Sequence, residues 1–328
     1  MVSSSRRAAL RSFLRAIVLV GPLACSASGP AGDEGAGEPL GHAASAILGS
    51  RPSDASQDAV VMLVFSDPAM NRRDICTAAL IAPRLVLTAR HCVSDTDADV
   101  ACAVDGSPAS GGAVLSNHDA GKLYVFTGTQ RPVLDPTTWK PAGHGIEVLD
   151  DGAKNLCNHD LALVVLEQPI MGTPLATLRL DGSVEKNEQL TTVGWGVTSA
   201  VDEPPARQQR TGVSVTRVGA DATTPVLTPN EFAFDESICL GDSGGPILSA
   251  STTAVVGVVS RGGNGTSSGT DLASTCTQAV NLGTKLAPFR DLIMRGFAQV
   301  GAAPIVEPPQ AHDAPTSGCS VAGRRKRH

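Results

Sequence analysis

The sequence contains no long hydrophobic run. No stretch of it has eighteen consecutive apolar residues, which excludes a protein with several membrane-spanning helices. Helical periodicity is scarce as well, and the 34 glycines and 22 prolines in 328 residues favour many short strands joined by turns. An excess of positive charge is also missing. The net charge of −6 argues against nucleic acid as the main partner.

What the chain does contain is enough apolar material for a folded core. Hydrophobic residues make up 42% of the sequence, and 328 residues suffice for one large domain or two ordinary ones. The sequence has eight cysteines, several of them at spacings typical of disulfide-bonded proteins. We therefore expect a globular protein that folds in an oxidising compartment.

Residues 1–25 have the features of an export signal. Four arginines precede the short apolar segment 16–20, which cannot span a bilayer, and small residues follow up to Cys25. Leu23-Ala24-Cys25 resembles a bacterial lipoprotein signal, although Pro22 stands where such signals carry Leu or Val. The sequence predicts export and leaves two forms open. One is tethered to a membrane by lipid on Cys25, at the outer membrane or in the periplasm, and the other is free and extracellular.

Two segments of biased composition flank the predicted folded region. Residues 26–46 are rich in Ser, Ala, Gly, Pro, Asp and Glu, and we interpret them as a flexible tether or a propeptide. Residues 301–328 are rich in Pro and Ala and end in a basic cluster, which predicts a disordered tail. Cys319 lies in this tail and is left without a predicted partner.

The strongest chemical motif surrounds Ser243. This residue lies in the string GDSGGP at 241–246, with Cys239 four residues before it. A serine hydroxyl is a poor nucleophile unless a base and oxyanion donors flank it. The neighbouring glycines let bare backbone N–H groups approach a substrate carbonyl. The motif therefore calls for a base and an orienting carboxylate upstream.

Residues that fit both roles lie in two further motifs. His91 follows the apolar strand candidate 85–87 within the string LTARHC, and Asp160 opens the apolar strand candidate 161–166. The string VGWG at 193–196 and the string SRG at 260–262 follow in order along the chain. Agreement among several independent motifs in one consistent order is stronger evidence than any motif alone.

Together these motifs resemble those of the chymotrypsin-like (trypsin family) serine proteases. The resemblance implies an all-β fold of two packed six-stranded antiparallel β-barrels with a C-terminal helix. The protease domain would span residues 47–300, with the first barrel over about 47–170 and the second over about 171–300. The apolar face formed by Leu286, Phe289, Leu292, Ile293 and Phe297 fits the closing helix.

The resemblance also implies the roles of the site residues. Ser243 would be the nucleophile, His91 the general base and Asp160 the carboxylate that orients the imidazole. The backbone N–H groups of Gly241 and Ser243 would form the oxyanion hole. Cleavage before Ile47 would free an α-amino group that pairs with Asp242.

The start of the folded region departs from the family pattern. Ala46 precedes Ile47 where Arg or Lys is usual, and Leu48 and Ser50 replace common residues. The alternative is that Ile47 merely begins the first strand. In that case Asp242 needs another donor, because an uncompensated buried charge is costly.

Three disulfides are expected. The family pattern implies a Cys76–Cys92 pair that closes the loop beneath His91, and a Cys239–Cys276 pair beside Ser243. Cys102 and Cys157 are expected to pair and to pin the long insertion between His91 and Asp160. Arg90 replaces the family's usual Ala, which is tolerable if the side chain points outward.

The specificity pocket is expected to contain Ser237, Ser260, Gly262 and Ala279. Ser237 stands where trypsin-like members carry the Asp that attracts Arg or Lys, so we expect preference for apolar or small side chains. Ala279 would narrow the pocket where Gly is common. A shifted loop that brings Asp235 or Glu236 to the pocket floor is the alternative.

These inferences lead to an exported serine endopeptidase that acts on proteins or peptides, needs no cofactor and is a monomer. The acidic residues at 95–105 lack recognisable ligand spacing, so no metal site is expected. Two alternatives remain. One is a catalytically silent binding protein on the same fold, and the other is an esterase-like acyl hydrolase.

Overall fold

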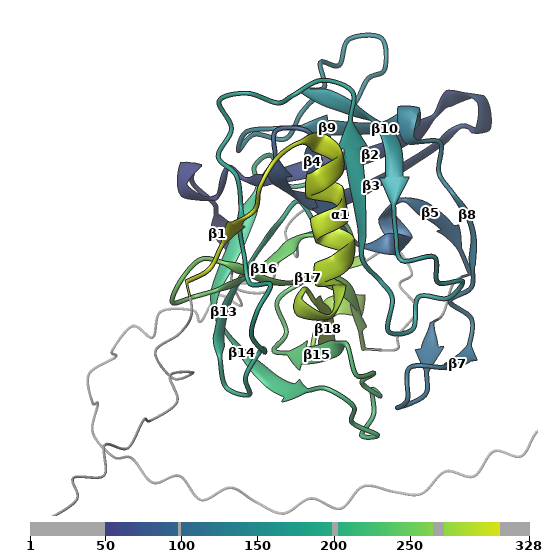
Figure 1. Cartoon of the computed structure of the whole chain (residues 1–328), viewed down its shortest axis with the longest axis vertical. Helices are drawn as coiled ribbons and strands as arrows, with labels where there is room; N and C mark the ends of the chain where they lie inside the picture. Colours follow the sequence, from purple (N-terminus) through teal and green to yellow (C-terminus); the bar gives the residue numbers. More distant parts are fainter. Residues whose placement is uncertain (1–49, 98–99, 199–202, 265–271, 309–328) are drawn as a thin grey trace, which may run out of the picture. The chain divides into compact units, whose positions relative to one another are not determined.

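The structure is a computed structural model that describes residues 50–97, 100–198, 203–264 and 272–308. Within these residues the chain forms two β-barrels and a single α-helix near the C-terminus (Figure 1). Short 3-10 helices lie at Ala55–Gln57, Pro68–Met70, Arg90–Cys92, Ala120–Lys122, Leu272–Cys276 and Ala287–Phe289.

The first barrel consists of six antiparallel strands in the closed order β10-β11-β4-β3-β2-β9. Their bounds are β2 Val60–Asp67, β3 Arg72–Ala82, β4 Leu85–Thr88, β9 Leu123–Phe126, β10 Gly143–Leu149 and β11 Ala162–Leu166. Every residue of β2, β4 and β11 is buried. This agrees with the apolar residues that make up most of each strand, because a strand covered on both faces shows no polar alternation.

The second barrel is built in the same way, in the order β16-β13-β14-β15-β18-β17, and the pairing of β16 with β17 closes it. Its strands are β13 Gln189–Gly194, β14 Gln208–Val218, β15 Glu231–Phe234, β16 Pro246–Ser249, β17 Val255–Gly263 and β18 Val280–Lys285. The prediction of two six-stranded antiparallel barrels is therefore confirmed.

One hydrophobic cluster joins the barrels and the helix. It contains Leu85 and Leu163 of the first barrel, Val258 of the second, and Ile293 and Phe297 of α1. The helix spans Arg290–Val300 and packs against β4 and β11 (Figure 1). The apolar face predicted for the closing helix is buried, so the helix covers the first barrel although it follows the second in sequence.

The segment after the helix corrects one prediction. A disordered tail was expected from residue 301 onwards, but residues 301–308 are folded. Strand β19, Ile305–Val306, pairs in parallel with β12, Thr177–Leu178, and β12 pairs in parallel with β17. Glu307 forms a buried ion pair with Arg179. Main-chain pairing and this ion pair supply contacts that the Pro/Ala-rich composition did not indicate.

The insertion between His91 and Asp160 carries two small antiparallel sheets of two strands each. Strand β5, Ser94–Thr96, pairs with β8, Val114–Asn117, and β6, Ala101–Cys102, pairs with β7, Pro108–Ser110. One further short strand, β1 at Arg51–Pro52, pairs with β14 of the second barrel.

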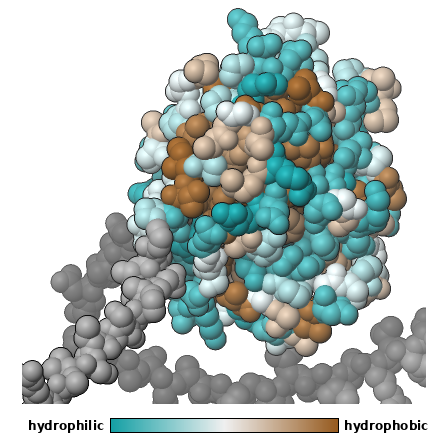
Figure 2. Space-filling view, viewed as in Figure 1, coloured by the Kyte–Doolittle hydropathy of each residue, from teal (hydrophilic) through white to brown (hydrophobic). Residues whose placement is uncertain are grey.

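Hydrophilic residues cover much of the face shown in Figure 2, and hydrophobic residues appear there in patches. This mixture is ordinary for a folded chain whose apolar strands are buried. Among the helices that the structure describes, none has the length and hydrophobicity to cross a bilayer.

Candidate active site

His91 and Asp160 are in direct contact although 69 residues separate them. The Nδ1 atom of His91 lies 2.9 Å from Oδ2 of Asp160 and 3.1 Å from Oδ1, and the backbone N–H of His91 donates to Oδ1 at 3.0 Å. His91 lies in the 3-10 turn Arg90–Cys92 after β4, and Asp160 precedes β11, which pairs with β4. Barrel closure thus brings the two motifs together.

The Asp160 carboxylate is 2% exposed and has a second donor. Ser260 of β17 donates a hydrogen bond of 2.6 Å from Oγ to Oδ2 of Asp160. Burial opposes ionisation, but His91 and these hydrogen bonds outweigh it and hold the pKa of Asp160 below its ordinary value. Asp160 therefore stays ionised and holds Nδ1 of His91 protonated, which leaves Nε2 of His91 as the available base.

The contact with Asp160 also changes the pKa of His91. Burial alone lowers the pKa of His91, but the charge of Asp160 and its hydrogen bond more than offset that effect, so the pKa is raised above its ordinary value of 6.5. The side chain remains 23% exposed. An imidazole of this kind accepts a proton on its free nitrogen more readily than an unpaired one.

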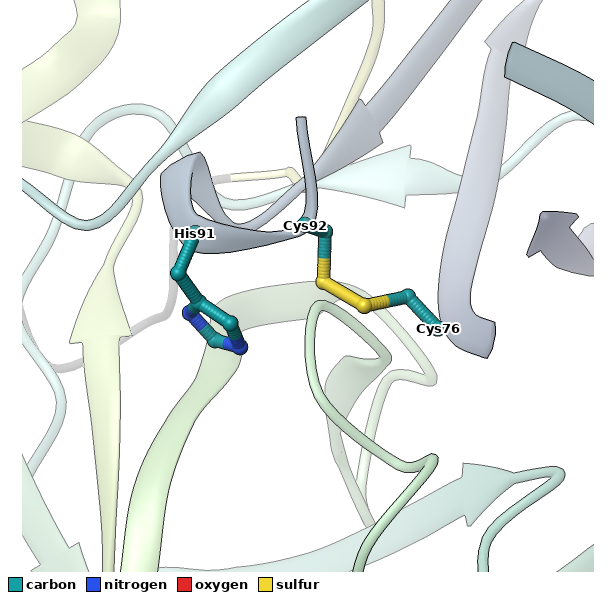
Figure 3. A group of neighbouring side chains, drawn as sticks. All are labelled: Cys76, His91 and Cys92. Atoms are coloured by element: carbon teal, nitrogen blue, oxygen red, sulfur yellow. A yellow bond between two sulfur atoms is a disulfide. The ribbon is translucent and has the colours of Figure 1, made fainter. Parts of the chain in front are cut away.

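A disulfide between Cys76 and Cys92 fixes the turn that carries His91 (Figure 3). Figure 3 shows the imidazole and the disulfide projecting from the same short turn. The two sulfurs and a ring nitrogen lie within 4.8 Å of one another. Zinc-type ligation requires cysteine thiolates, and these sulfurs are bonded to each other. This cluster is therefore a structural clamp and no metal centre.

Arg90 does not point outward as expected. It is buried and forms an ion pair with Asp150, which follows β10. A buried guanidinium needs a charged partner, and Asp150 supplies one from the first barrel. The presence of Arg instead of Ala next to His91 thus adds a link between the turn that carries His91 and the segment between His91 and Asp160.

Ser243 lies in the same cleft as His91 and Asp160, because all three residues line one hollow. Both Ser243 and His91 line two adjacent hollows of about 890 and 850 Å³, which meet at these residues. No hydrogen bond joins Ser243 Oγ to the imidazole in the part of the chain that the structure describes. Such bonds are often long in an enzyme without substrate and shorten when substrate binds.

Thr77 holds the loop around Ser243, a role that the sequence analysis missed. Its backbone N–H donates to the carbonyl oxygen of Ser243 at 2.9 Å, and its hydroxyl donates to the carbonyl oxygen of Gly241 at 2.9 Å. The same hydroxyl accepts a bond of 3.1 Å from the N–H of Trp195. Nothing in the string CTAA distinguishes this threonine, because its partners are more than 100 residues away.

The two N–H groups expected to form the oxyanion hole have no protein acceptor among the described residues. Among the described residues, neither the N–H of Gly241 nor that of Ser243 donates a hydrogen bond. Gly241 has a φ of +99°, a conformation that favours glycine. With the Gly241 and Ser243 carbonyls engaged by Thr77, these two amides are available to a ligand in the cleft.

Asp242 is buried behind this loop. Its carboxylate accepts hydrogen bonds from the N–H groups of Cys239 at 3.0 Å and Gly196 at 2.8 Å. Burial raises the pKa of Asp242 to about 7, because these bonds and the charge of Arg131 offset it only in part. Within the described residues Asp242 has no ion-pair partner. The expected partner, Ile47, lies outside the described residues, as does Cys25.

The predicted pocket residues occupy different positions around the cleft. Ser260 and Gly262 line the hollow on the β17 side, but the Ser260 hydroxyl is engaged with Asp160. Ser237 is fully buried and lies outside the lining, and its hydroxyl has no hydrogen-bond partner among the residues that the structure describes. Ala279 is buried just before β18 and also lies outside the lining.

The alternative loop residues do not reach the pocket floor. The Asp235 carboxylate accepts from the N–H of Ser214, and the Glu236 carboxylate accepts from the N–H of Gln278. Neither residue lines the hollow. No carboxylate from this loop therefore faces the site where Arg or Lys would bind.

The two remaining disulfides brace the same region. Cys239 and Cys276 join the segment before Ser243 to the 3-10 helix Leu272–Cys276. Cys102 and Cys157 close the insertion between His91 and Asp160. All three pairs are those named in the sequence analysis.

The fold and the order of His91, Asp160 and Ser243 define the class of chymotrypsin-like serine proteases. The Trypsin family model matches residues 47–282. Because this match covers most of the chain, the protein belongs to the trypsin family.

Two relatives show how far the similarity extends. Seminase of Drosophila melanogaster is 30% identical over 199 residues, which cover 57% of this chain and 63% of Seminase, less than two thirds of its length. The solved structure of neuropsin, a serine protease expressed in the limbic system of mouse brain, has a TM-score of 0.52 and 18% identity. That match covers 75% of this chain and 98% of neuropsin, and it supports the fold alone.

Proposed function

We propose that this protein is an exported serine endopeptidase that cleaves peptide bonds through His91, Asp160 and Ser243. One observation carries the proposal. A buried, ionised Asp160 holds His91 at the junction of two hollows, where Ser243 lies beside two unpaired amides. An exposed hydroxyl, a base and oxyanion donors around one cleft form the arrangement that acyl transfer requires.

The chemistry follows the Ser-His-Asp template. Ser243 Oγ attacks the peptide carbonyl while its proton passes to Nε2 of His91. The N–H groups of Gly241 and Ser243 stabilise the oxyanion that forms. The C–N bond then breaks, and His91 returns the proton to the leaving amine. Water then attacks the acyl-enzyme while His91 accepts its proton. The bond between the acyl group and Ser243 Oγ breaks, and His91 returns the proton to Oγ.

Labelling with a fluorophosphonate probe tests the nucleophile. We expect the wild-type protein to be labelled at Ser243, and we expect Ser243→Ala and His91→Ala to remain unlabelled. Ser249→Ala serves as the matched control, because Ser249 is a buried serine of β16 outside the cleft lining. A folded wild-type protein that does not react would contradict the proposal and favour the catalytically silent binding protein.

Substrate profiling separates the endopeptidase from the esterase-like acyl hydrolase. An endopeptidase cleaves internal amide bonds of a denatured protein and leaves products whose ends are read by mass spectrometry. Hydrolysis of activated esters without any amide cleavage would support the alternative instead. The cleft spans both sides of Ser243, which favours a substrate that extends in both directions.

The remaining parts of the proposal concern the export and the domain organisation of the chain. Residues 1–25 would direct export, residues 26–46 would form a tether or propeptide, and residues 47–300 would form the protease domain. The three disulfides support export to an oxidising compartment. N-terminal sequencing and intact mass of the exported protein test lipidation at Cys25 and cleavage before Ile47 in one experiment.

A further inference from the structure

Arg131 is a half-buried arginine with no ion-pair partner among the described residues, and no sequence motif contains it. It lies between β9 and β10 and lines a hollow together with His91 and Ser243. Its guanidinium donates from Nε to the carbonyl oxygen of Pro204 at 2.8 Å and from Nη2 to that of Trp195 at 2.6 Å. Both acceptors belong to the connection between β13 and β14, so a side chain of the first barrel braces part of the second.

The segment 195–197, which Arg131 holds, is bonded in turn to the loop that carries the two oxyanion amides. The N–H of Gly196 in this segment donates to the carboxylate of Asp242 at 2.8 Å. A Cβ built on Gly241 would lie only 3.0 Å from Cα of Gly196, so the two backbones are in close contact. A displacement of the segment would therefore move the loop as well.

The charge of Arg131 also acts on the buried Asp242, which is 1% exposed. It lowers the pKa of Asp242, although burial raises that pKa to about 7. Burial likewise lowers the pKa of Arg131, and the negative charges of Glu203 and Asp242 oppose this effect. Opposite charges attract beyond contact distance where little water separates them. Arg131 and Asp242 thus stabilise each other's charged forms.

We propose that Arg131 is a positioning residue for the oxyanion hole. Through its bond to Trp195 and its charge on Asp242, it holds the two amides in place without an α-amino group released at Ile47. The uncleaved chain is then an active enzyme. This inference rests on the proposed function, and it agrees with Ala46, which stands where the family pattern has the Arg or Lys of a cleavage site.

The uncleaved full-length chain gives the first test and needs no variant. Intact mass shows that the bond before Ile47 is unbroken, and a fluorophosphonate probe then measures the reactive serine. We expect the uncleaved protein to be labelled at Ser243 and to hydrolyse a peptide amide. Labelling that appears only after cleavage before Ile47 overturns this inference and leaves the proposed function intact. A folded protein that is labelled in neither form overturns the proposed function instead.

Arg131→Gln tests the residue itself in the uncleaved protein. Kinetics are measured with two peptide amides that differ only in Ala or Phe at the attacked residue. We expect kcat to fall by roughly 100-fold, as when an oxyanion donor is lost, with KM and the preference between the two peptides nearly unchanged. Arg131→Lys keeps the positive charge and should restore roughly 10-fold of this loss, because an opposite charge still favours ionised Asp242.

Arg210→Gln is the matched control, because Arg210 is a half-buried arginine of β14 that lines neither hollow. We expect it to leave kcat unchanged. An unchanged kcat in folded Arg131→Gln overturns the inference, and so does an equal fall in Arg210→Gln.

Unfolding in urea reports on the same pair without any catalysis. The charge of Arg131 lowers the pKa of Asp242, so that pKa should rise further in Arg131→Gln. The folded state then keeps its proton to higher pH, and the fall in the free energy of unfolding should extend further above pH 7 than in the wild type. Arg131→Lys and Arg210→Gln should keep the wild-type profile. Equal profiles in Arg131→Gln and the wild type overturn the action of Arg131 on Asp242, whether or not the protein cleaves peptides.

Discussion

Ser260 donates a hydrogen bond of 2.6 Å from its hydroxyl to the Asp160 carboxylate, and so connects β17 of the second barrel to the acid beside His91. From sequence alone, Ser260 is expected to line the specificity pocket. In the structure Ser260 lines the hollow beside Ser243, but its hydroxyl is hydrogen-bonded to the Asp160 carboxylate. The relative position of the two barrels therefore bears directly on the orientation of the imidazole.

Replacing Ser260 tests this link. Ser260→Ala removes a hydrogen bond to a charged group, which is worth roughly 1.5–3 kcal/mol. We expect kcat/KM to fall by roughly 10- to 100-fold, with the preference between Ala and Phe peptides unchanged. Ser260→Thr keeps the hydroxyl and should retain most of the activity. A change in substrate preference without loss of rate would show that Ser260 acts only in the pocket.

The pH dependence of activity follows from the His91–Asp160 pair. His91 must be neutral to accept a proton, and its pKa is raised above 6.5. Activity should therefore rise with pH through a value above 6.5 and be lost as pH falls below it. Asp160→Asn should move this acid limb to lower pH and reduce kcat by roughly 10⁴-fold, the loss found for this mechanism. An unmoved limb in a folded variant contradicts the assignment.

The buried Asp242 predicts a pH-dependent stability. Its pKa is raised to about 7 in the folded protein, above the ordinary value of 3.8, so the folded state holds this proton more tightly than the unfolded chain. The contribution of Asp242 to stability should then be largest at acidic pH and fall as pH rises from about 4 through about 7. Urea unfolding at pH 5 and pH 8 measures the slope of the free energy of unfolding against pH. Asp242→Asn should reduce it.

The same measurement reports on Ile47. If cleavage frees its α-amino group and that group pairs with Asp242, the pKa of Asp242 should fall, because an opposite charge favours the ionised form. In the cleaved protein, the free energy of unfolding should then no longer fall as pH rises through about 7. Identical slopes before and after cleavage would rule out this pairing.

Gly244, which follows Ser243, has no room for a side chain. Its φ is +75°, and an added Cβ would lie 2.0 Å from Oγ1 of Thr88 and 2.7 Å from the carbonyl oxygen of Thr77. Gly244→Ala should lower Tm markedly, because backbone strain alone costs about 1–3 kcal/mol and the overlap adds to it. Gly172→Ala is the matched control, since Gly172 has a φ of +76° and open space around it. Equal shifts in Tm would contradict the role of the overlap.

Much of this protein could be predicted from local sequence. His91, Asp160 and Ser243 each lie in a short motif that ends or begins a strand, and the apolar runs marked those strands. The fold followed from the resemblance that these motifs carry. The expectation that failed, a disordered segment from residue 301, concerned a strand whose partner, β12, lies more than 120 residues away.

The amino-acid sequence by itself thus determined the family, the strands and the three residues proposed for catalysis, because these depend on neighbouring residues along the chain. Only the tertiary structure decided what surrounds them. Thr77 acts through partners that barrel closure brings near, and Arg90 is buried because Asp150 lies within reach. Such contacts depend on packing between distant segments, which no local pattern of residues encodes.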